Sequence, residues 1–471
     1  MSPAAAAKQA VDLVIFARHV IPVVPLNVVL QDHAVVVKDA RIVAILPRAQ
    51  ALERYAAAVT KDLADHILIP GLVNAHTHAP LSLLRGLADD LPVSDWQTKW
   101  IWPAEGEFLS AAFVRDGAAH AAAEMIRGGT TCMSDMFHFG AESCDVVERA
   151  GMRALIGPMI MEFPSASGCD TDDYFAKTRV LLDKYKAGDN SSGDSLVRIG
   201  MAPHNTSVAG EDTLRKVDAW SREYNVPFNI HLHESASECD DSEQLNRESL
   251  NCHRSDQKLR PLANLKRMGL LSERLVCVHA AQMNDQEIQD IADAKAHVVH
   301  CPTSDLKLAS GICRVSDLLK AGVNVAIGTE GGFCNKLDMF AEMKLAAILA
   351  KVQSKESTNV PAAVALQMAT LNGAKAIGLE HEIGSIEIGK RADLVAVSCD
   401  NIEMLPMYNA ISHVVYVAGR ENVSDVWING KQVLADRELT TIDEVQVKAD
   451  VRKWNSKIRD FFFAQKEKTK Q

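Results

Sequence analysis

A repeated alternation of strand and helix patterns, from about residue 70 to residue 384, is the feature that most limits the fold. Apolar runs with the length of buried strands recur there, including LVRIGMAP, VPFNIHLH, LVCVHAA, AHVVHCP and NVAIGTE. Amphipathic segments of helical length lie between them, including AAFVRDGAAHAAAEMIRGG and NDQEIQDIADAK. Strands that alternate with helices pair in parallel through right-handed crossovers. About eight such units in roughly 310 residues predict an α/β fold with a (β/α)8 TIM-type barrel.

The segments on both sides of this region have a different sequence pattern, with short β-rich runs separated by polar turns. Period-2 alternation marks VDLVIFARHVIPVV and HAVVVKDARIVAILP near the start, and ADLVAVS and VSDVWINGKQVLADREL after residue 384. We predict that residues 1–68 and 385–440 join in one discontinuous β-sandwich domain. Residues 69–384 then form the barrel, and residues 441–471 form a helical tail.

Composition narrows the class of partner. The 471 residues carry a formal net charge of −11, so the chain has no basic footprint for nucleic acid or an anionic membrane. The start of the chain lacks a secretory leader pattern, and no apolar run approaches the length of a membrane span. The ten cysteines are scattered without a CxxC pair, which favours free thiols. We therefore expect a cytoplasmic protein with a small-molecule substrate.

Histidines and carboxylates recur where the predicted strands end. His76 and His78 close the run GLVNAHTH, and side chains two apart on a strand project from the same face. Because catalytic residues of such barrels come from the carboxyl ends of several strands, these imidazoles can converge on one metal ion. Two surface histidines remain the alternative for this pair alone. Four more strand ends carry the same residue types, at His231 with His233 and Glu234, His279, His300 and Glu330.

An ordered set of motifs extends this pattern over nearly the whole chain. These motifs are IPGLVNAHTHAPLSLLRGLADDLP, PAEGEF, HLHES, HCPTSDLKLASG, MATLNGAKAIGL and GSIEIGKRADLV. In that order they resemble the amidohydrolase superfamily, most closely its branch of methylthioadenosine/S-adenosylhomocysteine deaminases, which is related to triazine hydrolases. The resemblance implies a (β/α)8 barrel with a β-sandwich and one Zn²⁺ per subunit. Fe²⁺ or another divalent ion suits the same donors, and a homodimer or homotetramer is implied.

The resemblance also implies roles for individual residues. It makes His76, His78 and His231 metal ligands, together with Glu330, which is also a catalytic base. Glu234 becomes the acid/base and His279 the group that orients the water and the leaving group. Because Glu234 would face away from His231 in a regular strand, the chain must bulge or turn between them. The residues implied to lie beside the substrate are Trp96, His204, His233 and Ser304.

The chemistry implied is hydrolytic deamination of an adenosine-like purine. Neutral imidazoles and a carboxylate suit Zn²⁺, which lowers the pKa of a water molecule to about 7. Glu234 would move a proton from that water to the purine ring, and ammonia would leave.

Three departures from the family pattern face the predicted site, and a fourth lies two positions before Trp96. Glu330 stands where the family has Asp, and the turn after it contains the bulky Phe333 and is one residue shorter. HNTSV replaces a His-Ala-Pro-Tyr type of segment beside His204, and the stretch 236–260 is longer than expected. Ser94 replaces an acidic residue that binds ribose hydroxyls in relatives.

These departures leave two alternatives open. One is a hydrolase of another ring substrate of the triazine, pterin or guanine type, which would release a different group. The other is a catalytically silent paralogue that keeps the fold as a binding or regulatory subunit. Glu330 in place of Asp motivates both alternatives, because misplacement of a catalytic group by about 1 Å can cost about 100-fold in rate.

Overall fold

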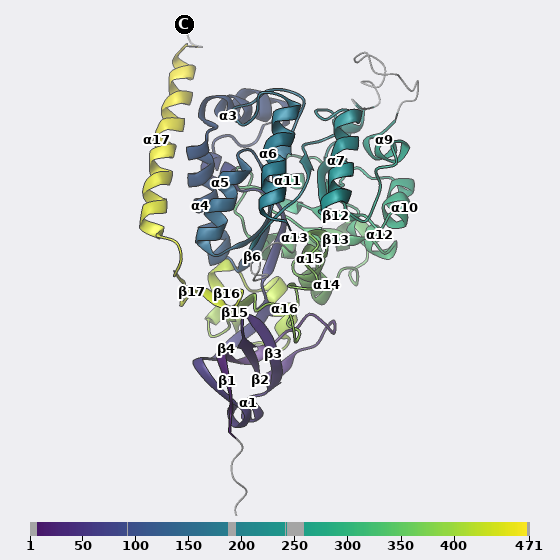
Figure 1. Cartoon of the computed structure of the whole chain (residues 1–471). Helices are drawn as coiled ribbons and strands as arrows, with labels where there is room; N and C mark the ends of the chain where they lie inside the picture. Colours follow the sequence, from purple (N-terminus) through teal and green to yellow (C-terminus); the bar gives the residue numbers. More distant parts are fainter. Residues whose placement is uncertain (1–6, 92, 187–194, 241, 243–258, 469–471) are drawn as a thin grey trace, which may run out of the picture.

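The computed structural model describes residues 7–91, 93–186, 195–240, 242 and 259–468. Figure 1 shows two parts, a body of helices around parallel strands and a sheet below it. The predicted alternation of strands and helices is confirmed as a mixed α/β fold with parallel sheets.

Parallel strands form the centre of the body. One sheet has the order β14-β5-β6-β7-β8 and a second has the order β10-β11-β12-β13, while β9 pairs with β7. These strands are β5 (Leu72–His78), β6 (Thr130–Phe137), β7 (Arg153–Ile160), β8 (Val197–Ile199), β9 (Ala202–Pro203), β10 (Phe228–Leu232), β11 (Leu275–His279), β12 (His297–His300), β13 (Asn324–Ile327) and β14 (Glu330–Gly331). Every residue of β5, β6 and β7 is buried, as expected for parallel strands covered on both faces.

Helices connect and cover these strands. They are η1 (Ala79–Leu84), α2 (Val93–Trp96), the π-helix η2 (Gln97–Ile101), α3 (Trp102–Phe108), α4 (Ala111–Arg127), α5 (Gly140–Ala150), α6 (Thr171–Lys184), α7 (Glu211–Tyr224), α9 (Pro261–Arg267), α10 (Asp285–Asp293), α11 (Pro302–Lys307), α12 (Val315–Lys320), α13 (Met339–Ser354), α14 (Ala362–Met368) and α15 (Leu371–Ala376). Several begin with a side-chain cap. Asn284 and Glu287 form a reciprocal capping box at α10, which satisfies backbone donors that the first helical turn leaves free.

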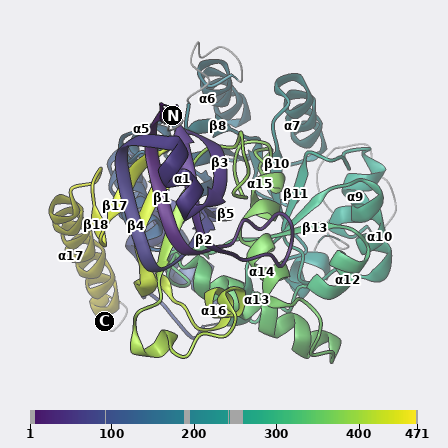
Figure 2. The ribbon, with the colours of Figure 1, turned by 90° about the horizontal axis from the view of Figure 1, so that it is seen from below.

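A third sheet joins the two ends of the chain. Its strand order is β18-β17-β16-β15-β4-β1-β2-β3, and β15 pairs with β4. The strands are β1 (Gln9–Val20), β2 (Leu30–Lys38), β3 (Arg41–Pro47), β4 (Tyr55–Pro70), β15 (Leu394–Ser398), β16 (Val423–Ile428), β17 (Lys431–Ala435) and β18 (Glu438–Leu439). The shorter helices α1 (Arg48–Arg54), η3 (Ile402–Met404), α16 (Ala410–Tyr416) and η4 (Arg420–Asn422) lie between them in the sequence. Figure 2 shows β1 to β4 from below.

The third sheet is tied to the body beside the first parallel strand. Only Gly71 separates β4 from β5, and its amide donates to the carbonyl of Asp393 at 2.9 Å. The carboxylate of Asp393 forms a buried ion pair with Arg153 of β7, at 2.9 Å from Nε. The body and the sheet therefore share a fixed junction at the start of β5.

The C-terminal helix α17 (Glu444–Lys468) covers one side of the body (Figure 1). Trp454 Nε1 donates to Asp116 of α4 at 2.7 Å, and the Trp454 ring packs edge-on against Phe113. This helix accounts for most of the predicted tail. None of the described helices is both long and apolar enough to cross a membrane.

Candidate metal centre

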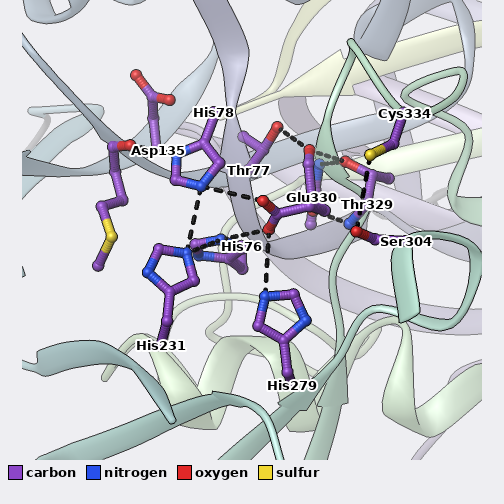
Figure 3. A network of polar contacts seen from close by, with 12 residues as sticks. His76, Thr77, His78, Asp135, His231, His279, Ser304, Thr329, Glu330 and Cys334 are labelled. Carbon is purple, nitrogen blue, oxygen red and sulfur yellow. Dashed lines mark hydrogen bonds and ion pairs between the residues drawn. The ribbon is translucent and has the colours of Figure 1, made fainter. Parts of the chain in front are cut away.

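The end of β5 places two imidazoles in the interior of the body. His76 and His78 alternate with Thr77 along a fully buried strand, so their rings leave the same face. His231, the fourth residue of β10, approaches from the opposite side. Its Nε2 lies 3.2 Å from Nε2 of His76 and 3.2 Å from Nε2 of His78 (Figure 3). Three ring nitrogens from two strands therefore meet at one point.

Backbone carbonyls fix the orientation of two of these rings. His78 Nδ1 lies 2.5 Å from the carbonyl oxygen of Met136, and His231 Nδ1 lies 2.8 Å from that of His204. In a neutral ring, each Nδ1 donates its proton to the carbonyl, which leaves Nε2 as an unprotonated acceptor. Two acceptor nitrogens that face each other at 3.2 Å repel unless a positive charge lies between them.

Glu330 supplies the negative member of the cluster. Its Oε2 lies 2.7 Å from His76 Nε2 and its Oε1 lies 3.1 Å from His78 Nε2. Burial would raise the pKa of Glu330, but the charges of His78 and His76 lower it well below its usual range. Burial would likewise lower the pKa of His78, but the charge of Glu330 raises it to about 9. The carboxylate therefore stays ionised and demands a cation beside it.

The four groups fit a metal ion. His76, His78, His231 and Glu330 each offer one ligand atom, and these atoms lie within 4.8 Å of one another. His279 Nε2 is a buried atom without a hydrogen-bond partner among the described residues. Unpaired buried polar atoms are costly, and a cation with its ligands satisfies them. Imidazole nitrogens with one carboxylate are the donors that Zn²⁺ prefers.

His279 is oriented by a carboxylate that the sequence analysis did not single out. His279 Nδ1 donates to Oδ1 of Asp305 at 2.8 Å, and both side chains are buried. His279 Nε2 points toward Glu330 Oε2 at 3.8 Å. Burial would lower the pKa of His279, but the charges of Glu234 and Asp305 raise it to about 10. Asp305 follows the end of β12 inside HCPTSDLKL. This position after a strand end could have identified it as a candidate site residue.

The chain makes the turn that Glu234 requires. β10 ends at Leu232, and His233 has a left-handed backbone with φ of 57°. Glu234 is half-buried beyond that turn. Burial raises its pKa, the charge of His279 opposes the shift, and the charge of Glu330 adds to it. A raised pKa favours the protonated form, so this carboxyl group holds a proton more readily than an exposed one does.

His233 lies outside the cluster. Its Nε2 accepts a hydrogen bond from the backbone amide of Leu262 at 3.0 Å, and its Nδ1 lies 3.4 Å from Cys239 Sγ. Both ring nitrogens are therefore engaged by the protein. The left-handed turn that directs Glu234 to the site also sends His233 toward α9.

The other residues expected beside the substrate lie around the cluster. The His204 ring packs 4.7 Å from the His231 ring, and its buried Nδ1 has no hydrogen-bond partner among the described residues. The Trp96 ring lies 4.8 Å from Phe333, which in turn stacks 6.4 Å from His78. Ser304 is buried, with Oγ 3.8 Å from Cys334 Sγ. The Phe333 ring thus lies between the rings of Trp96 and the candidate ligand His78 and contacts both.

Two of the departures fall wholly or partly outside the described residues. The side chain of Ser94 lies outside them, and so does most of the stretch 236–260. The altered turn after Glu330 is described in full. Gly331 is required there, because a Cβ at that position would lie 2.0 Å from the Phe333 ring.

A buried cluster of three imidazoles and a carboxylate at the ends of parallel strands is typical of metal-dependent α/β hydrolases. The chain belongs to the amidohydrolase family, which matches residues 67–433. The family predicted from the motifs is therefore confirmed.

Relatives and solved structures agree with this assignment. The chain is 37% identical over 449 residues to the 5-methylthioadenosine/S-adenosylhomocysteine deaminase of Teredinibacter turnerae, covering 95% of this chain and 98% of the relative. It is 43% identical to an adenosine deaminase from Xanthomonas campestris, whose crystal structure contains zinc, with a TM-score of 0.91 over 96% of this chain and 100% of the other. The zinc-complexed atrazine chlorohydrolase from Arthrobacter aurescens shares the fold, with 20% identity and a TM-score of 0.84 over 94% of this chain and 100% of the other.

Proposed function

We propose that the protein is a zinc-dependent hydrolase that deaminates an adenosine-like purine of the methylthioadenosine or S-adenosylhomocysteine type and releases ammonia. The observation that carries this proposal is the convergence of four ligand atoms within 4.8 Å at buried strand ends. The names of the relatives that are 37% and 43% identical supply the substrate class.

The chain's own residues divide the work. His76, His78, His231 and Glu330 would hold the zinc ion, which when bound lowers the pKa of a water molecule to about 7. Glu234 accepts a proton from the attacking water and delivers it to a purine ring nitrogen, so that a C–O bond forms as the ring accepts the proton. His279, held by Asp305, donates a hydrogen bond to the developing charge. The proton of the new hydroxyl group then moves to the amino nitrogen as the C=O bond forms, the C–N bond breaks, and ammonia leaves.

Uncharged groups beside the cluster suit a purine. Trp96 and Phe333 offer aromatic faces for a flat base, and stacking on such faces is favourable. Burial lowers the pKa of His204 to about 3, so His204 stays neutral and can exchange hydrogen bonds with a base. Ser304 provides a hydroxyl group, which lies 3.8 Å from Cys334 Sγ.

A substrate panel tests the proposal. Ammonia release would be measured with methylthioadenosine, S-adenosylhomocysteine, adenosine, guanine, an aminopterin and a chlorotriazine, each with zinc-loaded protein. We expect the three adenine nucleosides to give the highest kcat/KM. Faster release of another group from the triazine would favour the ring-hydrolase alternative. Zinc binding without turnover of any compound would favour the silent paralogue.

Removal of both β5 histidines is expected to abolish zinc binding. The variant His76→Ala/His78→Ala loses two of the four ligands, so its zinc content should fall from one equivalent to near zero. Metal that binds only the folded state stabilises it. The thermal midpoint of wild type should therefore rise with added zinc, whereas that of the variant should not. Unchanged zinc content in the variant, measured by elemental analysis, would refute the ligand assignment.

Replacement of Asp305 is expected to slow turnover without removing zinc. Asp305→Ala leaves the Nδ1 proton of His279 without its acceptor, so the ring loses its fixed orientation. Loss of such a partner typically costs about 10- to 100-fold. We expect kcat to fall within this range, with zinc content unchanged. Asp305→Asn keeps an acceptor oxygen, so its kcat should lie between that of wild type and that of Asp305→Ala. A larger loss of kcat in Asp305→Asn than in Asp305→Ala would contradict this role.

We also propose that the parallel strands close into a (β/α)8 barrel over residues 69–384, with a β-sandwich from residues 1–68 and 385–440. Two contacts between the sheets support closure. Met201 forms a bridge to Phe228 of β10, and the amide of Thr329 donates to the carbonyl of His76 at 3.1 Å.

A further inference from the structure

The backbone of Glu330 has an unusual conformation at the metal centre. Its φ is 57°, in the left-handed region that residues other than glycine rarely adopt. Such a conformation is strained and persists only where surrounding contacts hold it. From this backbone the carboxylate reaches both His76 and His78. The contacts that hold Glu330 therefore decide where its carboxylate lies.

Two threonine hydroxyls fix the carbonyl of Glu330. Thr77 Oγ1 donates to this carbonyl at 2.8 Å, and Thr329 Oγ1 donates to it at 3.2 Å (Figure 3). Both threonines are fully buried. Thr77 lies between the two ligands of β5, so this contact ties Glu330 to the same strand.

Asn74 holds the residue before Glu330 with both ends of its amide. Its Nδ2 donates to Thr329 Oγ1 at 2.7 Å, and its Oδ1 accepts from the Thr329 amide at 3.0 Å. The hydroxyl of Thr329 accepts from Asn74 and donates to the Glu330 carbonyl, so the donors and acceptors form one consistent chain. Asn74 is itself fully buried. It lies two residues before His76 on β5, where the pairing with β6 is irregular between Asn74 and Thr77.

A second set of contacts holds the other side of this segment. Asn335 Nδ2 donates to the carbonyl of Thr329 at 3.0 Å and to Glu342 Oε1 at 3.2 Å. Gly328 passes so close to β5 that a Cβ there would lie 2.8 Å from the carbonyl oxygen of His76. The segment from Gly328 to Asn335 is thus close to β5 at its start and anchored to α13 at its end.

We propose that Asn74 is a positioning residue for the metal centre. Through Thr329, it holds the left-handed backbone from which the longer carboxylate of Glu330 reaches the ion shared with His76 and His78. The inference rests on the metal-binding part of the proposed function and does not depend on the identity of the substrate.

Zinc affinity measured without substrate tests this role. A chelator would compete for zinc with wild type, Asn74→Ala, Thr329→Val and Thr329→Ser. We expect Asn74→Ala and Thr329→Val to raise the zinc dissociation constant by about 10-fold or more, the usual effect of losing a hydrogen-bond partner of a metal ligand. Thr329→Ser keeps the hydroxyl and should remain within about twofold of wild type.

Thr130→Val is the matched control. Thr130 is another fully buried threonine, on β6, whose hydroxyl has no hydrogen-bond partner among the described residues. Its replacement should leave zinc affinity unchanged. The thermal midpoint of each zinc-free protein shows whether the variant folds, and Asn74→Ala tests the same contact if Thr329→Val does not fold.

A double-mutant cycle separates positioning from a general structural effect. If Asn74 acts through Glu330, Asn74→Ala should have little further effect on zinc affinity in a Glu330→Ala background. An undiminished effect in that background would overturn the proposal, and so would unchanged affinity in Asn74→Ala alone. Because no substrate is present, neither outcome depends on whether wild type deaminates a purine.

Discussion

Glu234→Gln is expected to keep one equivalent of zinc and to lose turnover by about 10²- to 10⁴-fold, the usual contribution of general acid/base catalysis. Gln has nearly the size of Glu but cannot accept and release the proton. Glu234 stands beyond the left-handed turn at His233, with a pKa raised by burial and opposed by the charge of His279. Steady-state ammonia release and zinc content on the same samples provide the measurement.

Glu238→Gln is the control for this prediction. Glu238 lies four residues further on, and burial raises its pKa to about 7. Its carboxylate accepts hydrogen bonds from the amides of His233 and Glu234, at 3.3 and 2.7 Å, which assigns it a structural role. Its replacement should cost less than Glu234→Gln does. If Glu238→Gln caused the larger loss, Glu238 would be the proton carrier.

Glu330→Ala is expected to abolish hydrolysis, whereas Glu330→Asp should retain zinc and lose less activity. Alanine removes the only carboxylate among the four ligand groups, so the charge that balances the cation is lost. Aspartate keeps that charge but is shorter by about 1.5 Å, and misplacement of about 1 Å can cost about 100-fold. Turnover of an accepted adenine nucleoside and zinc content would be measured for both variants.

Two other outcomes have clear meanings. A gain of activity in Glu330→Asp, from a wild type that binds zinc without turnover, would identify the protein as a silent paralogue. Full activity in Glu330→Ala would place Glu330 outside the reaction despite its 2.7 Å contact with His76.

Local patterns predicted the elements of the fold better than their pairing. Apolar runs such as LVRIGMAP and NVAIGTE identified strands because continuous burial is written in neighbouring residues. The eight-stranded sheet depends on contacts such as that of β4 with β15, between residues far apart in the chain. No local pattern specifies which strand pairs with which, although the β-rich runs at both ends of the chain did predict that the two ends join.

The ligands were predictable from the sequence because they end strands with a regular period. His76, His78 and His231 follow from alternation and from the family motifs, and the structure brings them together. A turn between His231 and Glu234 was also expected, and the structure shows it at His233. The sequence does not specify which residue makes the turn, so the direction of the His233 ring could not be predicted from it. Asn74 lies only two residues before His76 in the motif GLVNAHTH, but Asn in a strand is more often read as a turn signal.

The eight-stranded sheet also sets an order for synthesis. Arg41 donates to the carbonyl of Gly389 across 348 positions, and β4 pairs with β15, so the early strands cannot complete their sheet until the late strands have left the ribosome. Loop closure over such distances is slow. The strand that carries His76 and His78 begins one residue after β4, at the junction that Asp393 fixes. A nascent chain stalled before β15 would therefore have both sheet neighbours of the strand with His76 and His78, β6 and β14, but would lack the contacts of Asp393 that fix the start of that strand.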